Sequence, residues 1–181
     1  MQSMALSWLI YRLTGSSLLL GVIGFANAIP LLFVSPFGGV LVDRFSKRKI
    51  LILTQTGMMV TAFLLALLTW MGHIQVWHIF LFTVINGAVA ALDAPCRQSF
   101  IIELVGKEDL MNAIAMNSMA FNSARIIGPA VAGFLVALIG EAGCFLINGI
   151  SFVSVLIGLF MIQSPDKTMD NSQERQRQRK S

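Results

Sequence analysis

Few side chains in this sequence can be charged, and those that could do chemistry lie at or near the ends of long apolar runs. Residues 38–49, GGVLVDRFSKRK, carry five charges within seven positions. A second pair, Asp93 and Arg97, is spaced i, i+4, and Arg125 lies inside an apolar run. Charges in such places bind ions, hold substrates or form ion pairs that open and close. The five charges of the first group are Asp43, Arg44, Lys47, Arg48 and Lys49.

Other reactive residue types are sparse and are not spaced for catalysis. Cys96 and Cys144 fall near opposite ends of predicted helices, and no CxxC or Cys/His ligand spacing occurs. His73 and His78 flank a short turn without a nearby thiol or carboxylate, which indicates an interfacial pair and not a metal site. The sequence has no glycine-rich phosphate loop and no nucleophile elbow. We therefore expect no metal, no cofactor and no enzyme activity, with an intramembrane enzyme as a remote alternative.

Composition indicates the environment of the chain. Of its 181 residues, 56% are hydrophobic and only 12% are charged. A soluble domain carries roughly twice that charged fraction, so the composition predicts an all-α integral membrane protein. The formal net charge of +4 could suggest nucleic-acid binding. Because the cations gather in loops and in the tail, the lipid bilayer explains them better, and we expect no nucleic-acid partner.

The apolar runs define the elements that must position these charges. A helix needs about 20 apolar residues to cross a bilayer, and five runs are long enough. Residues 4–13 are apolar but too short, so we expect the outer half of a helix whose beginning is missing. Residues 166–181 are polar and basic and read as a cytoplasmic tail or the start of a linker. The five predicted full spans are residues 18–42, 50–71, 77–96, 111–139 and 144–162.

Loop charges predict one orientation. The segments around Arg48, Lys107 and Arg179 are rich in Lys and Arg, whereas the turns near Gly72 and Gly140 have none. Since basic loops are retained in the cytoplasm, we expect those turns to lie outside the cell (inner) membrane. The sequence thus predicts a multi-pass protein with its basic loops and C-terminal tail on the cytoplasmic side.

Two motifs carry a resemblance to the major facilitator superfamily. Gly39-x-Leu41-x-Asp43-Arg44-x-x-Lys47-Arg48 resembles that family's signature between helices 2 and 3, with Ser46 at a usual glycine position. Residues 124–133, ARIIGPAVAG, resemble its helix 5 antiporter signature. Residues 92–98, LDAPCRQ, and 108–117, EDLMNAIAMN, are most similar to the bacterial branch of transmembrane secretion effectors, near the enterobactin exporter. The residues kept from the helix 5 signature are Gly128, Pro129 and Gly133.

The resemblance implies half of a major facilitator fold, with a partial helix 1 and five full transmembrane helices. Residues 1–165 would form the N-terminal bundle, and residues 166–181 the tail or the start of the inter-half loop. It implies a secondary transporter that exports a small drug- or siderophore-like molecule by alternating access. Its partners would be the lipid bilayer, the substrate and a missing C-terminal six-helix half. The helix 4 signature is half present: Thr83 stands where the family has an Arg linked to proton coupling, so standard proton coupling is in doubt.

Arg125 is the main candidate for substrate binding or coupling. It lies about 14 residues into its helix, or roughly 20 Å at 1.5 Å per residue, which is near mid-bilayer. Asn122, at i−3, shares its face. Arg125 either faces a central cavity and binds an anionic group, or is an inter-helix pin held by carbonyls. Asn27 and Asn86 either line the cavity or only bridge helices.

The resemblance also implies a cytoplasmic gate. Asp93 would meet Lys47 or Arg48, while Asp43 would contact a helix of the other half. Such a cluster can latch the cytoplasmic side while the cavity is open outward. The alternative is a plain surface ion pair worth less than about 1 kcal/mol. The residues assigned to this gate and loop motif are Gly39, Asp43, Arg44, Lys47, Arg48, Asp93 and Arg97.

A function of a different class stays open, that of a small membrane interaction protein without transport activity of its own. It would bind a partner or lipid through its exposed half-interface and its basic tail. A reading frame with six further spans beyond residue 181 would favour the transporter. A native stop codon there, with a stable membrane complex, would favour the interaction protein.

Overall fold

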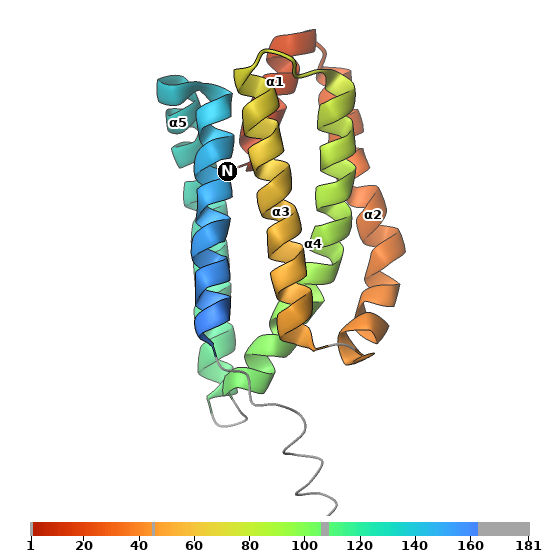
Figure 1. The fold of residues 1–181 in the computed structure, drawn as a ribbon, viewed down its shortest axis with the longest axis vertical. Helices are drawn as coiled ribbons and strands as arrows, with labels where there is room; N and C mark the ends of the chain where they lie inside the picture. Colours follow the sequence, from red (N-terminus) through yellow and green to blue (C-terminus); the bar gives the residue numbers. More distant parts are fainter. Residues whose placement is uncertain (1, 45, 106–108, 163–181) are drawn as a thin grey trace, which may run out of the picture.

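The chain folds into a bundle of long helices packed side by side (Figure 1). A computed structural model describes residues 2–44, 46–105 and 109–162, with the side chains of residues 35–44 excepted. Every element in these ranges is α-helical, which confirms the predicted all-α class. The helices are α1 (Gln2–Thr14), α2 (Ser17–Arg44), α3 (Lys47–Trp70), α4 (Val76–Val105) and α5 (Leu110–Met161).

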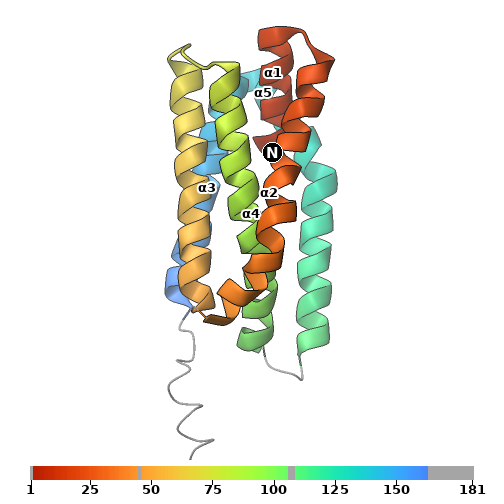
Figure 2. The same ribbon diagram turned by 90° about the vertical axis from the view of Figure 1, so that its right-hand side faces the viewer.

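The element α5 consists of two helical segments that run in opposite directions. Gly140 interrupts it with φ 71° and ψ 177°, a left-handed φ that suits glycine because it has no Cβ. Residues 110–139 and 141–161 therefore form a hairpin, and away from Gly140 the two segments lie on opposite sides of the bundle (Figure 2). The predicted turn over residues 140–143 is too long, because one glycine reverses the chain and the next helix begins at once.

Four of the helices are long and apolar enough to cross a membrane. In α2 the apolar stretch is Ser17–Val34, and α3, α4 and α5 each contain an apolar stretch of membrane length. Because α5 reverses at Gly140, it supplies two spans, which matches the five predicted from sequence. The 13 residues of α1 are too few for a span at 1.5 Å per residue, as expected for residues 4–13.

Two predicted boundaries at the charged ends are wrong. Lys47 already belongs to α3, whose N-cap is Ser46, so residues 47–49 form the first helical turn and not a loop. α4 continues past Pro95 to Val105, about nine residues beyond the predicted end. A proline lacks one backbone donor but does not end a membrane helix when neighbouring helices support it. The helical ends therefore carry the charges that the sequence placed in loops.

The core divides into two clusters along the bundle. The larger cluster joins all five helices around Leu9, Leu65, Ile79 and Phe145, toward the end that carries Gly140. The smaller cluster includes Ile50, Leu51, Cys96, Phe100 and Leu159, toward the other end. We call these the Gly140 end and the Asp93 end. By contrast, nearly every side chain of residues 110–139 is exposed, and Ala132 is the one buried residue in that fully described segment.

Candidate transport site

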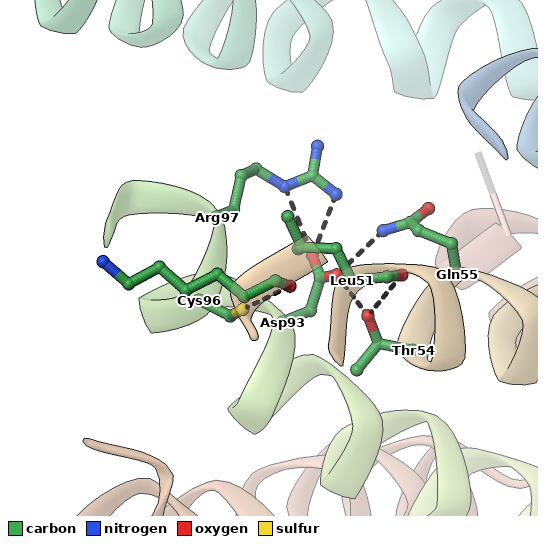
Figure 3. Close-up of polar contacts among 7 residues, drawn as sticks. Leu51, Thr54, Gln55, Asp93, Cys96 and Arg97 are labelled. Carbon is green, nitrogen blue, oxygen red and sulfur yellow. Dashed lines mark hydrogen bonds and ion pairs between the residues drawn. The ribbon is translucent and has the colours of Figure 1, made fainter. Parts of the chain in front are cut away.

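A buried carboxylate links α3 to α4 near the Asp93 end (Figure 3). Asp93 is only 7% exposed, and three side chains donate to it. Oδ1 accepts from the Thr54 hydroxyl at 2.7 Å and from Gln55 Nε2 at 2.8 Å. Oδ2 accepts from Arg97 Nη2 at 2.8 Å, one turn along the same helix. This donor set offsets the large penalty of removing a carboxylate from water.

The Thr54 hydroxyl has one proton and two acceptors within reach. It lies 2.7 Å from Asp93 Oδ1 and 3.0 Å from the Leu51 carbonyl oxygen. Because a charged acceptor gives the shorter and stronger hydrogen bond, the Thr54 hydroxyl donates to the Asp93 carboxylate and not to the Leu51 carbonyl. Thr54 thereby ties the rotation of α3 to that of α4 at this level.

The partners of the gate residues differ from those the resemblance implied. Asp93 does not meet Lys47 or Arg48. Lys47 Nζ pairs with Glu103 Oε2 at 2.9 Å, and Arg48 donates to the carbonyls of Leu159 and Phe160. The cause is geometric: the basic residues start α3 at the tip of the bundle, whereas Asp93 lies further in, level with Thr54 and Gln55.

At the Asp93 end, side-chain contacts hold α3 against α4 and against the 141–161 segment. Lys47 reaches α4 through Glu103 and the Ser99 carbonyl, at 2.9 and 3.4 Å. Arg48 reaches the 141–161 segment, at 3.0 Å from the Leu159 oxygen and 2.9 Å from the Phe160 oxygen. The Cys96 thiol donates to the Lys47 carbonyl oxygen at 3.2 Å. Of the other predicted gate residues, the side chains of Gly39, Asp43 and Arg44 lie outside the described part of the structure.

A cavity of about 270 Å³ with a mostly apolar wall opens near the middle of the bundle, beside the N-terminus of α1. Helices α1, α2 and α4 supply most of its wall, and Met58 of α3 and Phe152 of α5 complete it. Its apolar lining includes Leu6, Ile10 and Ile23. None of the described residues that line it is charged. The polar residues of the wall are Gln2, Ser3, Ser7, Asn27, Thr83 and Asn86.

Three of these six polar side chains, those of Gln2, Ser7 and Asn86, have hydrogen-bond partners within the described part of the protein. Asn86 Nδ2 donates to the Phe82 carbonyl at 2.8 Å, and the Thr61 hydroxyl lies 3.1 Å from Asn86 Oδ1. The Thr83 hydroxyl differs, because it is buried and has no hydrogen-bond partner among the described residues. Asn27 and Asn86, predicted either to line a cavity or to bridge helices, both line this one, and Asn86 also connects α4 to α3.

The helix 5 candidates lie elsewhere. Arg125 and Asn122 are exposed and do not line the cavity. Asn122 donates to the Ser118 carbonyl at 2.9 Å in its own helix. Arg125 has no ion pair or side-chain hydrogen bond within the described ranges, so no pin between these helices is formed there. At Gly128 and Gly133, the two glycines kept from the helix 5 signature, an added Cβ would meet nothing within 4 Å, so neither makes a close helix contact in the described bundle.

An ion pair near the Gly140 end escaped the sequence analysis. Arg12 Nη1 of α1 lies 3.2 Å from Glu141 Oε2, directly after the Gly140 turn. Glu141 is 4% exposed, and its other oxygen, Oε1, has no hydrogen-bond partner among the described residues. The signal was present in the sequence, because Glu141 is an acidic residue directly after a turn glycine and Arg12 is the one cation of the first apolar run.

No group of His, Cys, Asp and Glu in the described ranges could hold a metal ion. The chemistry available is therefore hydrogen bonding in the cavity and ion pairing at the two ends of the bundle. A mostly apolar wall with uncharged polar residues can hold a solute, and charged ends can hold helices together or release them.

Comparison with known proteins agrees with this picture. The family described as "Transmembrane secretion effector" matches residues 1–178. The chain is 29% identical over 156 residues to a staphyloferrin A transporter of Staphylococcus aureus, covering 85% of this chain and 39% of the relative. It is 26% identical over 155 residues to multidrug resistance protein 2 of Bacillus subtilis, covering 85% and 37%.

A third relative is the quinolone resistance protein NorA of Staphylococcus aureus, 26% identical over 156 residues, covering 86% of this chain and 38% of the relative. The chain thus spans less than two fifths of the length of these curated relatives. No solved structure matches it.

Proposed function

Because the chain belongs to the transmembrane secretion effectors, a branch of the major facilitator superfamily, we propose that it forms the N-terminal half of a secondary transporter. Residues 1–165 would be the helical bundle, and residues 166–181 would begin the connection to a second half. The transporter would export a small drug- or siderophore-like molecule by alternating access from the cell membrane. Its basic ends and its tail would face the cytoplasm.

One observation carries this proposal: a cavity with a mostly apolar wall and six uncharged polar residues lies within the membrane bundle. Polar groups at membrane depth are costly, so where they occur they commonly mark a substrate path or a binding site. In transporters built from two halves, such groups lie near the bilayer midplane at the interface of the halves. The relatives named for siderophore transport and for drug resistance support a small-molecule substrate of this type.

The contacts of the Asp93 end suggest how this half would move. Thr54, Gln55 and Arg97 hold Asp93 between α3 and α4, and Arg48 holds the 141–161 segment against α3. These three helical segments would act as one rigid body in the cycle. The 110–139 segment is largely exposed, so it would be the surface on which a second half moves, with Arg125 available to couple substrate movement.

Efflux of a fluorescent drug tests the proposal. Cells expressing the natural reading frame, intact and as Arg125→Ala or Asp43→Asn, are compared at equal membrane abundance. Loss of efflux in both variants is the expected result, because one would lose a mid-membrane cation and the other a contact to the second half. Unchanged efflux in both would make these residues structural, and the assigned roles would fail. The 181 residues alone, as a monomer, should not transport.

The exposed 110–139 segment also favours the second candidate, an interaction protein that docks a helical partner there. Crosslinking from Met119→Cys, which is exposed, distinguishes the two. A crosslink to a separate membrane protein, together with absent efflux, would support the interaction protein. A crosslink within one longer polypeptide would support the transporter.

A further inference from the structure

We propose that the cavity between α1, α2 and α4 binds an uncharged amphipathic solute, with the Thr83 hydroxyl as its hydrogen-bonding anchor. The inference deepens the proposed function, because it names the chemical class that this half of a transporter would hold. It concerns binding and does not depend on the direction of transport.

The Thr83 hydroxyl is the observation that points to a ligand. Thr83 is 5% exposed and lines the cavity, yet its oxygen has no partner within the part of the chain that is described. A threonine in a helix commonly donates to a carbonyl one turn earlier, as Thr56 does to Ile52 at 2.7 Å. A buried hydroxyl left unpaired is destabilising, so a group that bonds to it from within the cavity gains more than the same bond would in water.

The neighbouring polar groups indicate where the polar end of a solute would lie. Two of the other polar side chains of the wall are already engaged, because Ser7 donates to the Ser3 carbonyl and Gln2 Oε1 accepts from Asn148. Asn27 faces α4, because its Oδ1 lies 3.0 Å from the position a Cβ would take at Gly87. Asn27, Thr83 and Asn86 therefore form a polar corner in the α2–α4 wall, which offers both donors and acceptors.

The uncharged wall also disfavours anionic ligands. Among the described residues, none that lines the cavity carries a charge, and Ile10, Ile23, Met58 and Phe152 make much of it apolar. Burying a carboxylate or sulfonate without a cation or several donors is far more costly than burying an amide or an amine N–H. An uncharged solute with one polar group and an apolar body fits this wall.

Two fluorescent probes that share one ring framework test the charge preference. N-phenyl-1-naphthylamine is neutral, and 1-anilinonaphthalene-8-sulfonate adds one negative charge. The purified chain in lipid nanodiscs should bind the neutral probe saturably and at least about tenfold more tightly than the anionic one. Protein-free nanodiscs are the blank. Binding of the anionic probe with equal or higher affinity, or a neutral-probe signal no larger than the blank, would overturn the proposal.

Substitutions at Thr83 test the anchor. Thr83→Val keeps the shape and removes the hydroxyl, and it should weaken neutral-probe binding about fivefold, the size of one hydrogen bond. The same change should raise the melting temperature of the empty protein, because it removes a buried unpaired group. Thr83→Ser should restore binding, and Thr56→Val, the same change outside the cavity, should leave it unaltered. Unchanged binding in Thr83→Val would remove Thr83 from the site.

A substitution that fills the cavity shows whether the probe binds there. Gly24 lines the cavity and has no atom within 4 Å of an added Cβ, so Gly24→Leu should abolish binding without unfolding the bundle. Gly21 has the same open surroundings on the same helix but does not line the cavity, so Gly21→Leu is the matched control. Equal binding in both variants would place the probe elsewhere and overturn the site. Because binding is measured at equilibrium, loss of efflux with probe binding kept would count against the transporter and not against this site.

Discussion

The backbone carbonyl of Asn27 lies only 2.5 Å from the position that a Cβ would occupy at Gly87. Glycine at residue 87 therefore lets α2 approach α4 more closely than any other residue would allow. The contact lies beside the cavity, whose wall includes Asn27 and the Gly87 neighbour Asn86. The packing of two helices and the shape of the cavity thus depend on one missing methyl group.

Gly87→Ala should destabilise the bundle by about 1–3 kcal/mol, because the added methyl group meets backbone and not a flexible side chain. The buried thiols of Cys96 and Cys144 report unfolding when a maleimide dye reacts with them on heating. Gly57→Ala is the matched control, since its Cβ would meet Val89 at an ordinary 3.8 Å. A melting temperature for Gly87→Ala equal to that of Gly57→Ala would contradict the close approach.

Asp93→Asn should lower stability by about 1–3 kcal/mol, because an amide cannot accept from Thr54, Gln55 and Arg97 at once. Glu103→Gln breaks the Lys47–Glu103 pair, which is partly exposed, and should cost less than about 1 kcal/mol. The same thiol-reactive melting assay compares them. If the two variants have the same melting temperature, Asp93 contributes no more than a surface ion pair does, and it does not hold α3 against α4.

Removing only Arg12 from the Arg12–Glu141 pair should lower the free energy of unfolding more than removing both residues. Arg12→Met leaves Glu141 buried without its cation and should cost about 3 kcal/mol. Arg12→Met combined with Glu141→Met removes both charges and should recover part of that loss. Chemical denaturation in detergent measures the three proteins. A double variant less stable than Arg12→Met alone would show that Glu141 is satisfied by some other group.

Arg125→Ala should change stability by less than about 0.5 kcal/mol, because its side chain is exposed and contacts no acceptor in the described bundle. In the full-length protein the same variant should lose efflux, because it removes the mid-membrane cation proposed to couple substrate movement. Arg97→Ala, which removes a ligand of Asp93, is the contrasting variant and should destabilise. A large stability loss in Arg125→Ala would mean that the residue is packed against a partner.

Thiol labelling tests the predicted orientation. In a background with Cys96→Ala and Cys144→Ala, Lys49→Cys and His73→Cys place exposed thiols at opposite ends of α3. A membrane-impermeant maleimide added to intact cells should label His73→Cys, and should label Lys49→Cys only after the cells are opened. The reverse pattern would place the basic end outside and contradict the cytoplasmic assignment.

Sequence reasoning predicted the helices well because apolar runs of membrane length are a strong signal. It predicted five spans and one short helix, and it located the reversal near Gly140. The predicted helix boundaries were less accurate where charged residues occur. Lys47 and Glu103 fell outside the predicted spans, although both belong to helices. Charged residues at the ends of membrane helices extend into the interface and do not end the helix there.

The partners of the site residues were harder to predict. A helix that is apolar all round gives no polar stripe to show how it is rotated, so sequence cannot say which side chains face one another. The family resemblance implied that Asp93 would meet Lys47 or Arg48, and its contacts with Thr54 and Gln55 were missed. The cavity positions of Asn27 and Asn86 were among the stated alternatives, whereas Thr83 was noted only for the arginine it replaces.

The single-residue turn at Gly140 has a mechanical consequence. Two helices joined by one residue cannot separate at that residue. The distance by which one can move relative to the other therefore increases with distance from Gly140. The far ends are residue 110, beside α4, and residue 161, which follows the carbonyls that Arg48 holds. Any widening of the bundle between these two segments would therefore be a rotation of the 110–139 segment about the Gly140 joint.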